Sequence, residues 1–153
     1  MAIPSFMRSY SLRLARESDT HQIKDLIHLV GINPMGLDWR RFIVAVDDRD
    51  QVIGTGQIKP HGAEVLELAS IAVHPDRRGD GIARAIIEHL LKDSPRPLYL
   101  TCVFGMGPLY EKFGFVSLSY KDMPKYFQRL SKLANAFMSF AREGEHLQVM
   151  KLQ

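Results

Sequence analysis

The stretch from Arg77 to Ala83 combines two arginines with two glycines, which are residue types that bind phosphates. Gly79 and Gly81 would let a phosphate approach the backbone amides, because glycine has no side chain to hold it away. The first amides of a helix lack an intrahelical acceptor and lie at the positive end of the helix dipole. Arg77 and Arg78 add positive charge and paired hydrogen-bond donors. The pattern therefore predicts a diphosphate site.

The spacing excludes two other loops that hold phosphates at the start of a helix. A Walker loop requires Gly-Lys followed by Ser or Thr, and the chain contains no such run. A dinucleotide-binding fingerprint requires a glycine or alanine three residues after its second glycine, where this chain has Arg84. The residues alone indicate a diphosphate site and leave its ligand open.

Two motifs together resemble those of one enzyme family. Arg78–Ala83, which reads RGDGIA, resembles motif A of the GNAT superfamily of N-acetyltransferases, and an apolar strand precedes it as in that family. Leu109–Phe115, which reads LYEKFGF, resembles motif B of the same family. The order of elements agrees from Leu12 to the C-terminus. The central strand and the segment Tyr120–Phe127 are also similar to short N-acetylglutamate synthases.

The resemblance implies a ligand and the backbone that binds it. Acetyl-CoA would be the co-substrate, and no metal is expected. The pantetheine arm would pair with the backbone of Ile71, Ala72 and Val73. The pyrophosphate would be held by the amides of the motif A loop, namely those of Arg78, Gly79, Asp80, Gly81, Ile82 and Ala83. Val103 stands where many members of the family carry an asparagine, so no CoA contact is assigned to the loop that follows it.

Acetyl transfer to an amine needs a base and an acid, because an amine attacks a thioester only when neutral and is mostly protonated at pH 7. The motif B tyrosine is Tyr110, which the resemblance assigns as the general acid. We predict Glu67, on the central strand, as the general base; the alternative is a glutamate that is solvated or paired with Arg or Lys. Glu64 and His61 are further candidates in the preceding turn, and His74 is interpreted as a surface residue.

The sequence says less about the acceptor of the acetyl group than about its donor. The resemblance to N-acetylglutamate synthases favours a small primary amine, specifically an amino acid, whose carboxylate Arg40, Arg41 or Lys125 would receive; solvated surface charge is the other interpretation of these residues. A protein or peptide N-acetyltransferase is an alternative enzyme, and a CoA-binding regulatory module without turnover is an alternative of another class. Retention of Tyr110 and Glu67 argues against the module.

Apolar periodicity predicts the elements that position these residues. Strands are expected at 12–15, 42–46, 52–58, 67–73, 98–103, 115–118 and 147–152. Helices are expected after a cap at Ser18 or Asp19, from Ile82 onward, at Leu109–Phe113 and at Met123–Phe140. This order predicts an α/β or α+β fold with a mixed, mostly antiparallel, bent sheet of about six to seven strands flanked by helices.

The composition agrees with one domain that spans residues 1–153, with residues 1–10 as an N-terminal extension. The net charge of +3 is mild and spread along the chain, so no nucleic-acid partner is expected. No apolar run approaches the ~20 residues of a membrane span, and no signal peptide is recognised, so a cytoplasmic protein is expected. The single cysteine, Cys102, is interpreted as a buried thiol. The apolar face of the 123–140 helix would cover the core or form a homodimer.

Overall fold

The computed structural model describes residues 8–103, 105–138 and 147–153, which form two compact units. The first unit contains the described residues up to Lys59 together with Leu68–Ser94. The second contains Pro60–Glu67 and the described residues from Pro95 onward. Each unit is described by itself below.

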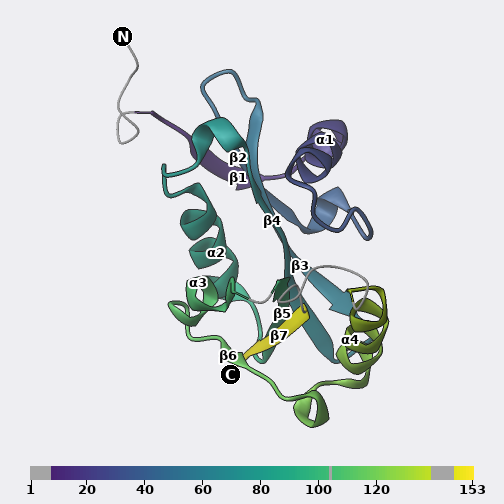
Figure 1. Cartoon of the computed structure of the whole chain (residues 1–153). Coiled ribbons are helices and arrows are strands. Elements are labelled where there is room, and N and C mark those ends of the chain that lie inside the picture. Colours follow the sequence, from purple (N-terminus) through teal and green to yellow (C-terminus); the bar gives the residue numbers. More distant parts are fainter. Residues whose placement is uncertain (1–7, 104, 139–146) are drawn as a thin grey trace. The chain divides into compact units, whose positions relative to one another are not determined.

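The described residues form seven strands and four α-helices (Figure 1). In chain order these are β1 (Ser11–Leu14), α1 (Thr20–Val30), β2 (Phe42–Val46), β3 (Val52–His61), β4 (Val65–Val73), α2 (Ile82–Asp93), β5 (Leu98–Val103), α3 (Gly107–Glu111), β6 (Val116–Ser117), α4 (Lys125–Met138) and β7 (Leu147–Leu152). The strands are hydrogen-bonded in the order β1-β2-β3-β4-β5-β7-β6. β4 and β5 are parallel, whereas β1 with β2, β2 with β3, β5 with β7 and β6 with β7 are antiparallel. This mixed sheet with flanking helices confirms the predicted fold class.

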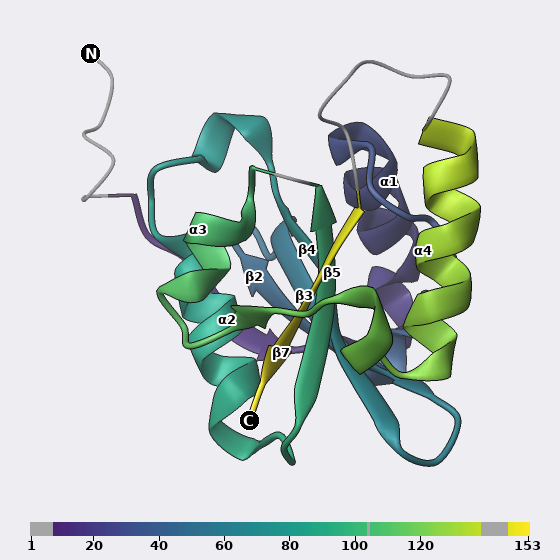
Figure 2. The ribbon, with the colours of Figure 1, turned by 60° about the horizontal axis from the view of Figure 1, so that its bottom comes forward.

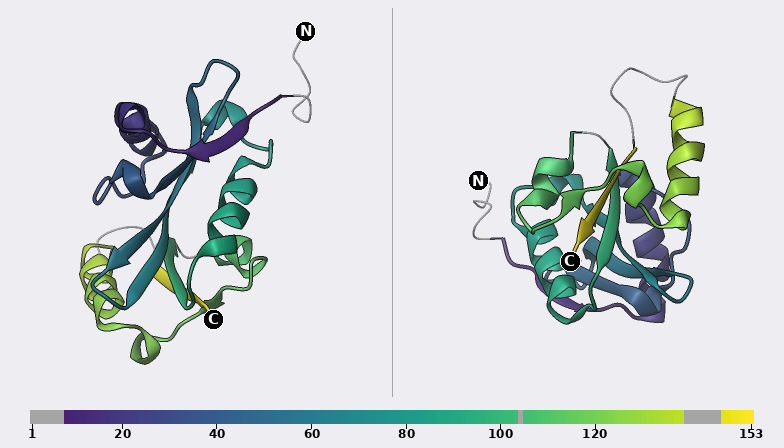
Figure 3. Two further views of the ribbon diagram at one scale, coloured as in Figure 1. Left: turned by 180° about the vertical axis from the view of Figure 1, so that it is seen from behind. Right: turned by 90° about the horizontal axis from the view of Figure 1, so that it is seen from below.

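In the first unit, α1 and α2 lie on opposite faces of the strands (Figure 3). Under α1 lies an apolar cluster of buried residues from α1, β2, β3, β4 and the position after β1, namely Ala15, Ile23, Leu26, Ile27, Phe42, Val44, Val46, Val52 and Ala72. The other face meets α2 at Gly54 and Gly56 of β3. A Cβ at Gly56 would lie 2.5 Å from Cγ2 of Ile86, so α2 packs too close to β3 for a side chain at this position.

The first helix begins and ends where capping rules predict. Asp19 precedes α1, and Gly31 ends it with a φ of 80°, a conformation that glycine adopts without strain. The Asp19 carboxylate accepts hydrogen bonds from Arg13 Nη1 and from the Arg16 amide, both at 2.7 Å. Asp19 therefore ties β1 to the start of α1 through a buried ion pair rather than by capping the helix with its side chain.

In the second unit, α4 packs against β5 and β7 (Figure 2). Their contact is a cluster of Tyr99, Phe127 and Val149, all buried. The helix starts at Lys125 rather than at Met123, because Pro124 disfavours helical backbone at the residue before it. Residues 139 and 140, expected in this helix, lie outside the described residues.

Several other expectations changed or stay open. The predicted strand at 115–118 shortens to Val116–Ser117, and the predicted turn between residues 58 and 67 is mostly strand, since β3 reaches His61 and β4 begins at Val65. Of the predicted N-terminal extension, residues 1–7 lie outside the described residues, and β1 begins at Ser11. The single domain over 1–153, the bend of the sheet and the homodimer stay predictions.

Candidate functional site

The predicted phosphate loop lies between β4 and α2, as the sequence indicated. Pro75–Arg77 forms a 3-10 turn after β4, and Gly81 is the N-cap residue of α2. Gly79 and Gly81 have φ angles of 85° and 80°, and a Cβ at either would meet no atom within 4 Å. Glycine is therefore needed here for its backbone conformation. The space beside both residues is open to a ligand.

A buried carboxylate braces this loop from the inside. The Asp80 side chain is only 1% exposed and accepts hydrogen bonds from Arg77 Nε at 2.8 Å and from Arg8 Nη2 at 3.1 Å. Arg8 Nη1 also donates to the Asp76 carbonyl at 2.7 Å, and Arg77 Nη2 donates to the Ser9 carbonyl at 3.0 Å. The residues before β1 thus hold the loop in place. Sequence reasoning missed Arg8, because 72 positions separate it from Asp80 and no motif contains it.

The two arginines predicted to face the phosphate have different roles. The Arg77 side chain donates hydrogen bonds to the Asp80 carboxylate inside the loop and to the Ser9 carbonyl before β1. Arg78 is exposed and makes no hydrogen bond or ion pair with any residue in the described part of the chain. Arg78 is therefore the side chain left to meet an anion, and the amides of Arg78 to Ala83 stay the predicted pyrophosphate ligands.

The central strand is kinked just before the residues predicted to bind pantetheine. Ser70 has a φ of 59°, which is rare for a residue with a side chain. Thr55 Oγ1 donates to the Ser70 carbonyl and Gln57 Nε2 donates to Ser70 Oγ, each at 2.8 Å. The kink interrupts the alternation of faces that the sequence predicts from Glu67 to Val73, so that prediction is wrong beyond Ser70. Pantetheine binding by Ile71, Ala72 and Val73 stays a prediction.

In the second unit, Glu67 lies in a buried cluster with His61. Glu67 Oε1 is 2.6 Å from His61 Nε2, and the two side chains are 10% and 9% exposed. Glu67 Oε2 accepts a hydrogen bond from Thr101 Oγ1 at 3.2 Å. The alternatives of a solvated glutamate or one paired with Arg or Lys are therefore wrong. His61 ends β3 and does not lie in a turn, which explains how it faces a residue of the adjacent strand.

Aromatic rings of α4 complete this cluster. The ring of Tyr126 stacks on that of His61 with 3.8 Å between centroids and 17° between planes. Phe127 meets the His61 ring edge-on at 6.0 Å. Burial, and then the nearby Glu67 charge, raise the pKa of Tyr126, so its hydroxyl stays protonated at neutral pH. Sequence reasoning placed Tyr126 in the apolar face of the helix and in the segment that resembles N-acetylglutamate synthases, and it predicted no contact with His61.

The predicted acid, Tyr110, lies on α3 in the same unit. Its ring meets Phe115 edge-on at 6.4 Å. Burial, and to a lesser extent the nearby Cys102, raise the pKa of Tyr110, so the phenol is protonated at neutral pH as a proton donor must be. No hydrogen bond joins Tyr110 to Glu67 among the described residues. Both catalytic assignments stay predictions.

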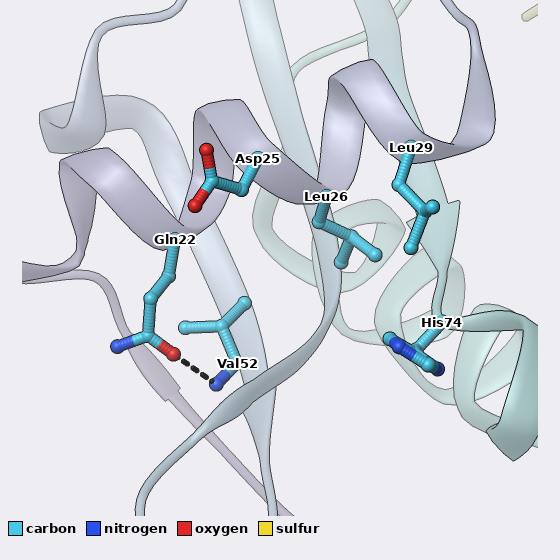
Figure 4. Close-up of a pocket in the computed structure, with 6 residues that line it drawn as sticks. All are labelled: Gln22, Asp25, Leu26, Leu29, Val52 and His74. Carbon is cyan, nitrogen blue, oxygen red and sulfur yellow. Dashed lines mark hydrogen bonds between the residues drawn. The ribbon is translucent and has the colours of Figure 1, made fainter.

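A pocket of about 230 Å³ opens elsewhere on the first unit (Figure 4). It is lined by Gln22, Asp25, Leu26, Leu29, Val52 and His74. Gln22 Oε1 accepts a hydrogen bond from the Val52 amide at 2.9 Å, and His74 Nδ1 accepts one from the Asp76 amide at 3.1 Å. The pocket contains none of the residues predicted to bind acetyl-CoA. His74 acts in the turn that leads into the phosphate loop.

Three further observations concern the acceptor site, metal sites and membrane-spanning helices. Arg40, a candidate for a substrate carboxylate, pairs with Asp38 at 3.3 Å and lies over the Trp39 ring. Within the described residues, no three side chains of His, Cys, Asp or Glu are grouped as a metal site would require. The same residues include no helix with the length and apolar character needed to cross a membrane.

The fold and the loop are those of an acetyltransferase domain. The acetyltransferase (GNAT) domain family matches residues 38–117, which is more than half of the chain and includes both motifs. The protein belongs to the GNAT acetyltransferase family. No curated protein sequence matches the chain.

Solved structures of this fold resemble the chain at low sequence identity. N-acetylglutamate synthase from Neisseria gonorrhoeae, complexed with coenzyme A and N-acetyl-glutamate, is 20% identical with a TM-score of 0.69 over 95% of this chain and 35% of that one. Rv2747 from Mycobacterium tuberculosis, in complex with CoA and NLQ, is 20% identical with a TM-score of 0.69 over 94% of this chain and 99% of that one. Escherichia coli ElaA is 14% identical, with a TM-score of 0.65 over 96% and 100%. The chain thus spans about a third of the length of the gonococcal enzyme.

Proposed function

We propose that the protein transfers the acetyl group of acetyl-CoA to the primary amine of a small molecule by direct attack in a ternary complex, and that the acceptor is an amino acid. The observation that carries this proposal is the buried pair of Glu67 and His61, two groups that can take up a proton, on adjacent strands. A module that only binds CoA has no need of such a pair, which argues for turnover.

The diphosphate of acetyl-CoA would bind the phosphate loop between β4 and α2. Open space beside Gly79 and Gly81 gives a phosphate access to the amides at the start of α2. Arg8 and Arg77 offset the charge of the buried Asp80 carboxylate, which lies between Gly79 and Gly81. The exposed Arg78 supplies positive charge that a bound diphosphate would neutralise.

The proton chemistry would involve Glu67 and Tyr110. An amine that arrives protonated must lose a proton before it attacks, and the cluster around Glu67 is the acceptor we propose. The departing thiolate must gain a proton, and the protonated phenol of Tyr110 is the donor we propose. Direct attack needs no covalent acetyl-enzyme, so it requires only that both substrates are bound together.

An amino-acid acceptor is supported by two solved structures of the same fold. The gonococcal enzyme was complexed with N-acetyl-glutamate in one structure and with L-arginine in another. Arg41 and Lys125 are exposed and could receive a carboxylate, whereas Arg40 already pairs with Asp38. A protein or peptide acceptor is the competing proposal, and a panel of amines separates the two.

Calorimetric titration with CoA tests the phosphate site. Gly81→Glu places a carboxylate beside the proposed diphosphate and should weaken CoA binding by more than tenfold. Gly31→Glu is the matched control, because Gly31 has the same φ of 80° and the same open surroundings at the end of α1. Equal CoA affinity in the two variants would overturn the assignment of the loop.

Thiol release in the presence of amino acids, polyamines and peptides then tests the reaction. Turnover with one or more amino acids, and slower turnover with peptides, is the expected result. Turnover with peptides alone would replace the amino-acid acceptor by a protein substrate. Binding of CoA without turnover for any amine would favour the regulatory module.

A further inference from the structure

His61 lies where a proton acceptor could be oriented by a carboxylate. We propose that His61 Nδ1 takes the proton from the acceptor amine, and that Glu67 is the positioning residue that orients His61 and stabilises its charged form. This inference rests on the proposed function and deepens it, because it moves the general base from Glu67, the predicted residue, to its neighbour.

The contacts of Glu67 favour the positioning role. Both of its carboxylate oxygens are engaged, Oε1 with His61 Nε2 at 2.6 Å and Oε2 with Thr101 Oγ1 at 3.2 Å. The exposed fractions of the two side chains are nearly equal, 10% for Glu67 and 9% for His61, so the hydrogen bonds and not the exposure distinguish their roles. A carboxylate held in this way is well suited to fix the orientation of a neighbouring group.

The contacts of His61 favour the acceptor role. When Glu67 is ionised, Nε2 carries the proton that it donates to the carboxylate, and Nδ1 is left with a free lone pair. Nδ1 has no hydrogen-bond partner among the described residues. A carboxylate at one ring nitrogen stabilises the imidazolium that forms when the other nitrogen gains a proton, which is the logic of histidine–carboxylate pairs in hydrolases.

Tyr126 and Phe127 hold the imidazole in this orientation. Tyr126 covers one face of the ring, and Phe127 approaches it from another direction. Among the described residues, the ionisable groups that face His61 are Glu67 and Tyr126. An imidazole that turned its Nε2 away from Glu67 would lose the hydrogen bond to the carboxylate, and a ring that left this plane would also lose the stack on Tyr126.

The reaction balances with this assignment. The ammonium group of the acceptor gives one proton to His61 Nδ1, and the neutral nitrogen forms a bond to the thioester carbon. The carbon–sulfur bond then breaks, sulfur takes the phenol proton of Tyr110, and the phenolate recovers a proton from the same nitrogen, which has become an amide. His61 releases its proton to solvent. The products are the acetylated amine, the CoA thiol and one proton.

Chemical rescue distinguishes the two possible bases. His61→Ala should lower kcat by about 10²-fold or more, the range expected for loss of a general base, while CoA affinity stays within twofold of wild type. Added imidazole should restore part of the rate in His61→Ala and none in Glu67→Ala, because only the first variant lacks the group that imidazole replaces. His21→Ala, which changes a histidine that is 88% exposed on α1, is the control and should keep full activity.

A second variant keeps the test valid if the cavity in His61→Ala prevents folding. His61→Gln retains a donor to Glu67 but cannot accept the proton, so it should fold and should lose the acidic limb of the kcat/KM profile. An unchanged acidic limb in His61→Gln, or no imidazole rescue in a folded His61→Ala, would show that Glu67 is the direct base. Wild-type protein without turnover for any amine would instead remove the proposed function.

Discussion

Replacing Arg8 by alanine tests whether residues before β1 help to bind acetyl-CoA. Arg8 donates to Asp80 and to the Asp76 carbonyl, and it shares the Asp80 carboxylate with Arg77. Arg8→Ala removes one of these two guanidinium groups and leaves that of Arg77. We expect the loop to sample conformations in which the amides before α2 no longer converge on one phosphate.

We base the magnitude on the hydrogen bonds from Arg8 to Asp80 and to the Asp76 carbonyl. A hydrogen bond to a charged group contributes about 1.5–3 kcal/mol when buried, and less when solvent screens it. The Arg8 side chain is 31% exposed, so we discount the two bonds together to about 1–2 kcal/mol. If ordering of the loop is fully coupled to binding, CoA affinity falls about five- to thirtyfold.

Calorimetric titration of CoA measures this loss, and Arg49→Ala provides the control. Arg49 is an exposed arginine in the same unit, and its removal changes the net charge by the same amount. Catalytic efficiency with S-acetyl-pantetheine, which lacks the diphosphate, should be equal in the two variants. If Arg8→Ala binds CoA as tightly as Arg49→Ala does, the reasoning about the brace is refuted.

Other predictions concern packing, an ion pair and the acid. Gly56→Ala should lower the free energy of unfolding by about 1–3 kcal/mol because its Cβ would overlap Ile86, and an unchanged urea midpoint would contradict the close packing of α2. Asp19→Asn should cost about 1.5–3 kcal/mol at pH 7. The hydrogen bond from Arg13 lowers the pKa of Asp19. The stabilisation by the Asp19 carboxylate is therefore complete above its unfolded-state pKa of about 3.9 and is lost as pH falls through its folded-state pKa. If Asp19→Asn costs the same at pH 7 and at pH 3, this explanation is refuted. Tyr110→Phe should lower kcat about 10²-fold with unchanged CoA affinity, and wild-type turnover would exclude Tyr110 as the acid.

The fold was largely predictable because local signals and apolar periodicity agreed. Gly31 ends α1, and the alternating run from Leu147 forms β7, as expected. The errors lie where tertiary contacts decide the outcome. The hairpin of β3 and β4 is longer than its apolar run suggests, since polar residues such as His61 pair as strand when buried partners face them. Ser70 kinks β4 although serine carries no signal for a positive φ.

The motifs of the candidate site were predictable from the sequence, whereas the distant residues that contact them were not. Gly79 and Gly81 adopt the conformations that the phosphate-loop interpretation requires, because glycine in a strand–loop–helix context leaves few alternatives. The partners of the motif residues come from distant positions. Arg8 reaches Asp80 and Tyr126 reaches His61 across long stretches of chain, and a single sequence contains no signal for either pair.

The strand β4 carries residues of both proposed roles. Glu67 lies near its start and pairs with His61, and the residues predicted to bind pantetheine, Ile71 to Val73, lie at its end. A protein that bound CoA without turnover would have no need of a buried histidine–carboxylate pair on the strand that leads into its phosphate loop.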